Sequence, residues 1–437
     1  MLRSALFTLG ILGGALTACS SAPIESGAGG TGGDSGGTGG GQGATSGTGA
    51  QGGSAGSSAV TDYTSSPCYG QSSSTQVYDL STHATHSVTA TCRAEGAFAR
   101  VYVADELWQT QAAPSDEPLD QDQINAFMAG YELHGATGSF HPELGVLPTD
   151  EAVYGTIPDA KLTDGRLPIY IVDSGGAGEG YLCSWCENTQ LHLDYTLLGS
   201  LHSDKTFSIA AHESFHAIHH AYDGTEAMWV DETFAESAMT VNGYYTDQQW
   251  VSTFLRDPNV MWGPGLSSST DFNYGAGLLL GTYLWERDGA DFMYAVTHDP
   301  KHEWAGIDSA LASVGDAATS WELWSELGLA IFLDDPASGY ALASFDLGAK
   351  VATTPVTTGK PLKLTLQPYG FVFVTFDANA AQVTLTSDGS IAASLVYPGE
   401  PADVRELTVG QNVTLEGTPR VLLLTAQQKT PFVLTVE

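Results

Sequence analysis

Hydrophobic positions along the first three quarters of the chain change from a strand-like to a helical spacing. Apolar runs predict buried strands at 98–103 and 167–172, and a shorter pattern predicts a strand at 190–196. Apolar residues at helical spacing predict a helix at 120–134 and a mostly helical region from 203 to 333. Within that region we expect helices at 207–222, 228–239, 247–255, 274–287, 292–297 and 321–333.

After residue 349 the pattern becomes one of short alternating strands separated by Gly, Pro, Asp and Asn. The expected strands are 362–366, 371–376, 382–386, 391–396, 412–415, 421–425 and 432–436. This spacing is typical of a small β-sandwich. The chain is therefore predicted to be α+β, with a body at 67–349 that combines a mixed sheet with helices, followed by an all-β sandwich at 350–437.

The first residues predict an export signal. A basic start at Arg3 precedes an apolar run at 5–16, which is too short to span a bilayer and is typical of a signal peptide at 1–18. Its end, Leu16-Thr17-Ala18-Cys19, resembles a bacterial lipobox. The resemblance implies a lipid on Cys19 as the only membrane attachment and, with Ser20, an outer-membrane lipoprotein at the cell surface or in the periplasm. The alternative is an ordinary secretory signal with a chance cysteine.

Residues 19–66 are predicted to form a disordered tether, because half of the residues from 27 to 58 are glycine and most others are small and polar. The chain has 50 acidic residues against 15 Lys and Arg, a formal net charge of −35. Phosphate binding requires clustered basic side chains, so a nucleic-acid partner is excluded. The charge lies almost wholly outside the tether and favours basic peptides as substrates.

Four cysteines follow Cys19, an even number that favours disulfides in an exported chain. Their proximity along the chain favours the pairs Cys68–Cys92 and Cys183–Cys186. The second pair could instead be redox-active or bind a metal, because its spacing is Cys-x-x-Cys.

The sequence His212-Glu213-Ser214-Phe215-His216 contains the pattern His-Glu-x-x-His. On a helix, the two histidines lie one turn apart on one face and can bind a single Zn²⁺. Glu213 would then be placed to act as general base on water at the metal. An apolar stripe beside the histidines lets this helix pack on the core while both imidazoles face a cleft. Alternatively, the two histidines are buried as part of the core and bind no metal.

A catalytic zinc usually has a third protein ligand. The acidic residues that follow, all candidates, are Asp223, Glu226, Asp231, Glu232 and Glu236. The pattern Trp229-x-x-Glu232-x-x-Ala235-Glu236 resembles the glutamate helix of gluzincin metallopeptidases, especially hyicolysin-like enzymes and related bacterial lipoprotein peptidases. This resemblance implies a zincin-like body, Glu232 as third ligand, and Glu236 as a residue that orients a ligand or a substrate amine.

The sequence departs from that family pattern in two ways. Asp231-Glu232-Thr233 replaces the usual Asn-Glu-Gly or Asn-Glu-Ala. Glu232 also follows His216 more closely than the glutamate does in thermolysin-like members, whose longer separation would select Glu236.

Tyrosines and histidines around the motif are further candidates. Asn273-Tyr274-Gly275 resembles a helix start in the same relatives, which implies that Tyr274 stabilises the oxyanion, with Tyr244 and Tyr245 as alternatives. His219 and His220 either orient a ligand or, as we expect, only fill core or surface positions. A strand at 190–196 or 167–172 could pair with an extended substrate.

These observations predict a zinc-dependent peptidase that hydrolyses peptide or protein substrates. The alternative is a non-catalytic zinc-binding surface or adhesion lipoprotein with a peptidase-like fold. A third possibility is a structural lipoprotein without a metal. The sequence leaves the cleavage preference, the role of the sandwich and the oligomeric state open.

Overall fold

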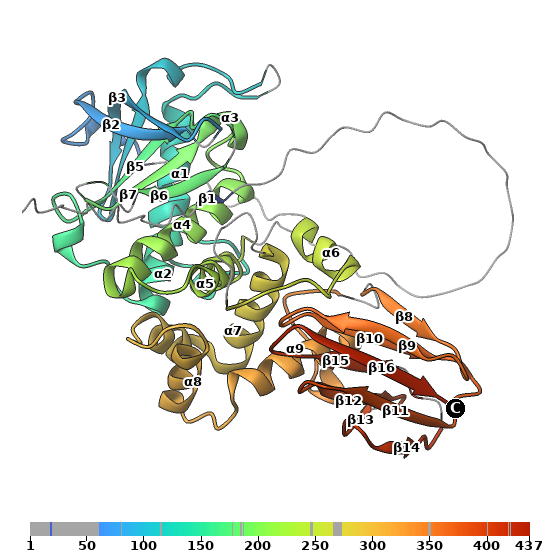
Figure 1. Ribbon diagram of the computed structural model, residues 1–437. Helices are drawn as coiled ribbons and strands as arrows, with labels where there is room; N and C mark the ends of the chain where they lie inside the picture. Colours follow the sequence, from blue (N-terminus) through green and yellow to red (C-terminus); the bar gives the residue numbers. More distant parts are fainter. Residues whose placement is uncertain are drawn as a thin grey trace, which may run out of the picture.

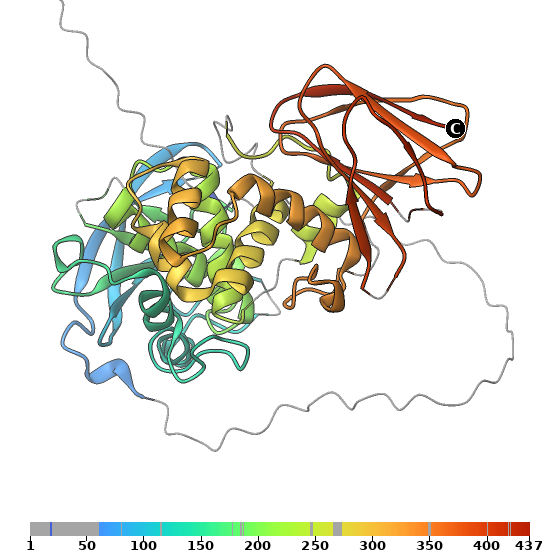
Figure 2. The ribbon, with the colours of Figure 1, turned by 90° about the horizontal axis from the view of Figure 1, so that it is seen from below.

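The structure, a computed structural model, has an α+β fold, which confirms the predicted class (Figure 1). It describes residues 18–19, 61–79, 81–113, 116–176, 178–183, 186, 188–244, 248–264, 273–347, 351–399, 401–417, 419 and 421–437. A mixed sheet lies at one end of the molecule, a group of helices in the middle and the β-sandwich at the other end (Figures 1 and 2). Most of the predicted signal peptide and tether, and Tyr245, lie outside the described residues.

The N-terminal sheet has the strand order β1-β6-β7-β5-β4-β3-β2. Strands β4, β5 and β7 run parallel, and the remaining neighbours are antiparallel. Its strands are β1 Ala18–Cys19, β2 Ser72–Asp79, β3 Ala84–Glu95, β4 Ala99–Ala104, β5 Leu167–Val172, β6 Gly180–Cys183 and β7 Gln190–Asp194. The strand expected at 190–196 ends early, because the Asp194 carboxylate accepts hydrogen bonds from Thr196 and Leu197 and starts helix α3, Tyr195–Leu198.

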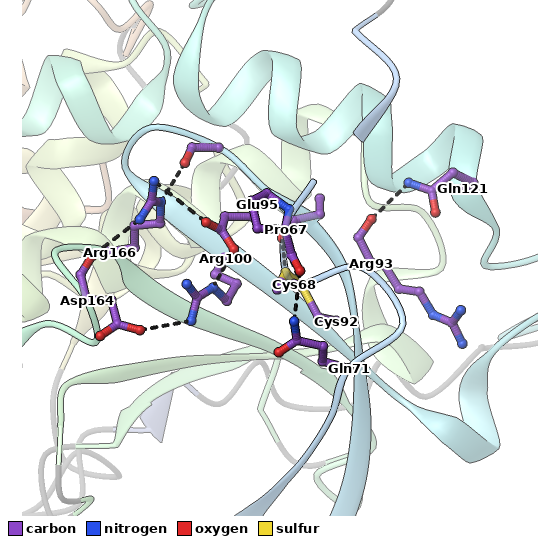
Figure 3. The surroundings of a disulfide bond; sticks show 12 residues. Pro67, Cys68, Gln71, Cys92, Arg93, Glu95, Arg100, Gln121, Asp164 and Arg166 are labelled. Carbon is purple, nitrogen blue, oxygen red and sulfur yellow. Dashed lines mark hydrogen bonds and ion pairs between the residues drawn. A yellow bond between two sulfur atoms is a disulfide. The ribbon is translucent and has the colours of Figure 1, made fainter. Parts of the chain in front are cut away.

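Tyr63, near the end of the predicted tether, packs against the body. Tyr63 starts a single 3₁₀ turn, Tyr63–Ser65, and its side chain is buried in the main core. The disulfide Cys68–Cys92 then joins this entry segment to β3, and Cys183–Cys186 closes the end of β6, so both expected pairs are confirmed. Beside Cys92, the Glu95 carboxylate forms ion pairs with Arg100 and Arg166 (Figure 3).

The helices follow most of the predicted segments. Their bounds are α1 Gln121–Glu132, α2 Val146–Tyr154, α4 Asp204–Asp223, α5 Met228–Val241, α6 Gln248–Arg256, α7 Tyr274–Thr297, α8 Glu303–Val314 and α9 Ser320–Leu333. The two helical segments expected at 274–287 and 292–297 are both present within α7, where a kink at the non-helical Gly289 (φ 69°) separates them. The pattern missed α2 and α8.

The sandwich consists of a five-stranded sheet, β13-β12-β15-β10-β8, and a four-stranded sheet, β14-β11-β16-β9. All seven predicted strands are present, and the pattern missed β8 and β13. The strands are β8 Thr353–Val356, β9 Leu362–Leu366, β10 Phe371–Phe376, β11 Gln382–Ser387, β12 Ala392–Tyr397, β13 Asp403–Glu406, β14 Asn412–Thr414, β15 Val421–Thr425 and β16 Thr430–Val436.

Two apolar cores stabilise this arrangement. One lies between the two sheets of the sandwich and includes Leu385, Leu422 and Leu434. The other fills the body and continues into the sandwich through Phe371 and Leu423. The sandwich is thus packed against the helices by apolar contact. Within the described residues, no helix has both the length and the apolar character that crossing a membrane requires.

Candidate metal centre

Helix α4 carries the His-Glu-x-x-His pattern and is held under the N-terminal sheet, in contact with β6 and β7. Ser203 caps it, since its hydroxyl accepts a hydrogen bond from the Thr206 backbone N–H at 3.1 Å. Strand β6 can lie directly on this helix because residue 180 is glycine. A Cβ there would come 2.8 Å from Ile209 Cγ2 and 3.3 Å from Glu213 Cγ.

Helix α5 packs beside α4 and supplies the carboxylates of the site (Figure 1). Asp231, Glu232 and Glu236 are all buried, at 3%, 0% and 3% exposure. Buried carboxylates require partners, because an isolated buried charge is costly. For Asp231 and Glu236, those partners are histidines of α4.

His212, His216 and Glu232 converge as the ligand set predicted from the sequence. The Nε2 atoms of the two histidines lie 3.0 Å apart, and Glu232 Oε2 lies 3.4 Å from His212 Nε2 and 4.0 Å from His216 Nε2. Tetrahedral zinc with ligands at about 2.1 Å places its ligand atoms about 3.4 Å apart. The three residues, each at most 1% exposed, can therefore hold one metal ion.

The polar contacts around these atoms also fit a bound cation. Within the described part of the chain, neither carboxylate oxygen of Glu232 has a hydrogen-bond partner. The outer nitrogens of both histidines face carboxylates: His212 Nδ1 lies 3.1 Å from Glu236 Oε1, and His216 Nδ1 lies 3.0 Å from Asp231 Oδ2. If each Nδ1 carries the hydrogen, both Nε2 lone pairs point at one another and at Glu232, an arrangement that a cation between them would relieve.

Asp231 and His216 shift each other's pKa values. Burial by itself disfavours the charged form of Asp231, but the adjacent His216 and His220 hold the pKa of Asp231 well below its usual range. Burial likewise opposes protonation of His216, yet the charge of Asp231 raises the pKa of His216 above its ordinary value. Asp231 is thus a carboxylate, and it can only accept hydrogen bonds.

Glu236 contacts the outer nitrogen of His212, whereas Glu232 faces the inner nitrogens of both histidines. Glu236 therefore lies on the outer side of the His212 ring, away from His216. Of the two glutamates between which the sequence left a choice, the structure brings Glu232 to the metal-binding atoms.

Glu213, the expected general base, is fully buried on α4 and lies against β6 at Gly180. The next residue of β6, Tyr181, points to the opposite face of the sheet, where its hydroxyl accepts a hydrogen bond from the backbone N–H of Tyr78. Its hydroxyl contacts His192 Nδ1, and burial together with the charges of Asp194 and Glu213 raises its pKa.

Tyr274 and Tyr244, two of the tyrosines expected to stabilise an oxyanion, pack against aromatic side chains. Tyr274 is the first residue of α7, and its ring packs against Trp250 of α6 at 5.6 Å between centroids. Tyr244 packs against Phe207, near the start of α4. Burial, with the charge of Asp204, raises its pKa to about 12. A role for Tyr274 in the chemistry stays a prediction.

His219 and His220 do not merely fill space, contrary to the expectation. His219 Nδ1 lies 2.6 Å from Asp231 Oδ1, and His220 Nε2 lies 3.0 Å from Asp231 Oδ2. The sequence showed that these histidines share a helix with His216, but their contact with Asp231 depends on how α5 packs against α4.

No protein-family model matches the chain, and no curated protein matches it either.

Proposed function

We propose that the chain is a zinc-dependent peptidase in which His212, His216 and Glu232 bind the metal and Glu213 is the general base. The observation that carries this proposal is the convergence of the two Nε2 atoms and Glu232 Oε2, with Glu213 on the helical turn between the two histidines. The donor set of two imidazoles and one carboxylate is one that zinc favours in hydrolytic enzymes.

The residues have separate tasks in this proposal. When bound, the zinc ion would supply Lewis-acid activation of a water and of the scissile carbonyl. Glu213 takes the proton of the attacking water and passes it to the leaving amine. Glu236 orients His212 through its Nδ1.

The resemblance to gluzincin metallopeptidases and the export signal extend this proposal. The glutamate helix supports membership of the gluzincins, with the β-sandwich as an added domain. The lipobox-like end of the signal supports a lipid anchor at Cys19, and two disulfides in the body agree with an exported protein. Intact-mass measurement of the mature protein from a bacterial host tests the anchor, since an unlipidated Cys19 would contradict it.

A second candidate, a non-catalytic zinc-binding surface protein, is favoured by one observation. Each of the three ligands and Glu213 is at most 1% exposed. A peptide carbonyl must approach the metal for hydrolysis, whereas simple metal binding has no such requirement. Digestion of casein by the zinc-loaded protein separates the two candidates.

The test compares zinc content and hydrolysis in the wild type and three variants. We expect one zinc per chain and hydrolysis for the wild type, one zinc without hydrolysis for Glu213→Gln, and loss of zinc for Glu232→Ala. Glu236→Ala should bind zinc more weakly but still bind it. Loss of zinc in Glu236→Ala alone would overturn the choice of Glu232, and full activity in Glu213→Gln would overturn the mechanism.

A further inference from the structure

Asp231 is the point where three histidines of α4 meet one carboxylate of α5. Its Oδ1 lies 2.6 Å from His219 Nδ1, and its Oδ2 lies 3.0 Å from both His216 Nδ1 and His220 Nε2. Asp231 is 3% exposed and His219 is 2% exposed, while the His220 side chain keeps 22% of its surface exposed. Of the three, only His216 is among the proposed ligands.

Hydrogen bonds join Asp231 to His219 Nδ1 and His220 Nε2, and because a carboxylate accepts hydrogen bonds and donates none, these two nitrogens carry the hydrogen. His216 Nδ1 forms an ion pair with Asp231 Oδ2 at 3.0 Å. For His216, a hydrogen on Nδ1 leaves the Nε2 lone pair for a metal. The tautomer of a metal-binding histidine is commonly fixed in this way by the partner of its other nitrogen.

The carboxylate of Asp231 is itself held in place by the two other histidines. His219 contacts the oxygen that His216 does not use, and His220 shares the oxygen that His216 does use. Rotation of this carboxylate away from His216 would break the contacts to both other histidines. His219 and His220 therefore contribute to the orientation of His216 through Asp231.

We propose that Asp231, His219 and His220, here called the outer triad, hold His216 in its metal-binding orientation and tautomer and thereby set the affinity of the centre for a divalent transition-metal ion. This inference rests on the proposed metal centre but not on peptide hydrolysis. Asp231 acts as a positioning residue, and His219 and His220 act through it.

The test measures the dissociation constant for Zn²⁺ by competition with a chromophoric chelator, on the full-length protein. We expect Asp231→Asn to weaken binding about 10- to 100-fold, the usual range for the loss of such a partner. His219→Gln and His220→Gln should each weaken it by a smaller factor, about 3-fold or more, because Asp231 remains but is less well fixed. His302→Gln is the matched control: His302 pairs with Asp223, outside the centre, and its removal should leave the zinc affinity unchanged.

The visible spectrum of the Co²⁺-loaded protein provides a second readout, one that a general loss of stability would not produce. We expect the ligand set, and hence a tetrahedral Co²⁺ spectrum, to persist in all four variants at saturating metal. The two histidine variants keep the test decisive if Asp231→Asn does not fold.

The outcomes distinguish this inference from the proposed function. Unchanged zinc affinity in folded Asp231→Asn, or in both histidine variants, overturns the outer triad while the metal centre stands. Complete loss of the Co²⁺ spectrum in Asp231→Asn, with its retention in Glu232→Ala, would make Asp231 a ligand and overturn the positioning role. A wild-type chain that binds no zinc would overturn both proposals.

Discussion

Two clusters of buried side chains meet on helix α5, and they are built on opposite principles. The candidate metal centre joins carboxylates of α5 to histidines of α4. The second cluster, here called the aromatic junction, starts from Trp229 in the first turn of α5. It consists of Trp229, Trp262, Trp304, Trp324, Tyr369 and Phe371.

The aromatic junction connects α5 to the sandwich. Trp262 stacks on Trp324 at 4.8 Å between centroids, and Trp324 stacks on Phe371 of β10 at 4.7 Å. Contacts of this kind contribute mainly through buried apolar area and tolerate a range of ring geometries. The metal centre, in contrast, depends on individual atoms at fixed distances. Changes at the junction should therefore lower stability, whereas changes at the centre should lower metal affinity.

The largest expected effect lies in the junction. Trp324→Ala removes a fully buried ring between Trp262 and Phe371 and should lower the free energy of unfolding by about 3–5 kcal/mol. Urea unfolding measures this loss. Trp321→Ala, at a half-buried ring beside Tyr369, is the control and should cost less. If Trp324→Ala folds but no longer binds zinc, the aromatic junction and the metal centre do not act independently.

Metal removal should have the next largest effect. Free Zn²⁺ at 100 times its dissociation constant should stabilise the wild type by about 2.7 kcal/mol, because only the folded chain holds the three ligands together. Thermal unfolding with and without a chelator measures the difference. Glu232→Ala should show no such difference, and an equal response in that variant would place the stabilising ion elsewhere.

A smaller effect is expected at the start of α9, the helix that carries Trp324. Thr319 caps this helix in a capping box with Glu322. Thr319→Ala should cost about 1 kcal/mol of stability, and Thr319→Ser should retain most of it because the hydroxyl remains. Zinc affinity should be the same in both variants. A loss of zinc affinity in Thr319→Ala would show that the junction and the centre are coupled.

The smallest effect is expected at Asp288, outside both clusters. Burial, with repulsion from Asp316, raises the pKa of Asp288 to about 6. The folded state therefore binds a proton that the unfolded state releases, and this residue makes stability fall as pH rises from about 4 to 6. Asp288→Asn should remove that dependence and gain less than about 1 kcal/mol at pH 7, after allowance for solvent screening. Denaturant unfolding of the wild type and Asp288→Asn at pH 4 and pH 7 measures this difference. An equal gain in stability at both pH values would show that the raised pKa of Asp288 is not its cause.

Sequence patterns predicted the elements whose periodicity is long or strongly apolar. Strand β5 and helix α4 fall in this class, as do most strands of the sandwich. Helix α2 was missed because it is short and contains Pro148. Strand β6 was missed because its four residues follow a glycine-rich segment and carry too few alternating positions to show a period.

The sequence by itself determined the α+β class, the two disulfide pairs and the spacing that places His212 and His216 on one turn of a helix, since all of these depend on local periodicity or on proximity along the chain. Only the tertiary structure decided which glutamate of α5 faces both histidines and which carboxylate each histidine contacts. Those choices depend on the rotation and offset with which α5 packs against α4. No local pattern encodes them, because Asp231, Glu232 and Glu236 are equally acidic and differ only in where that packing places them.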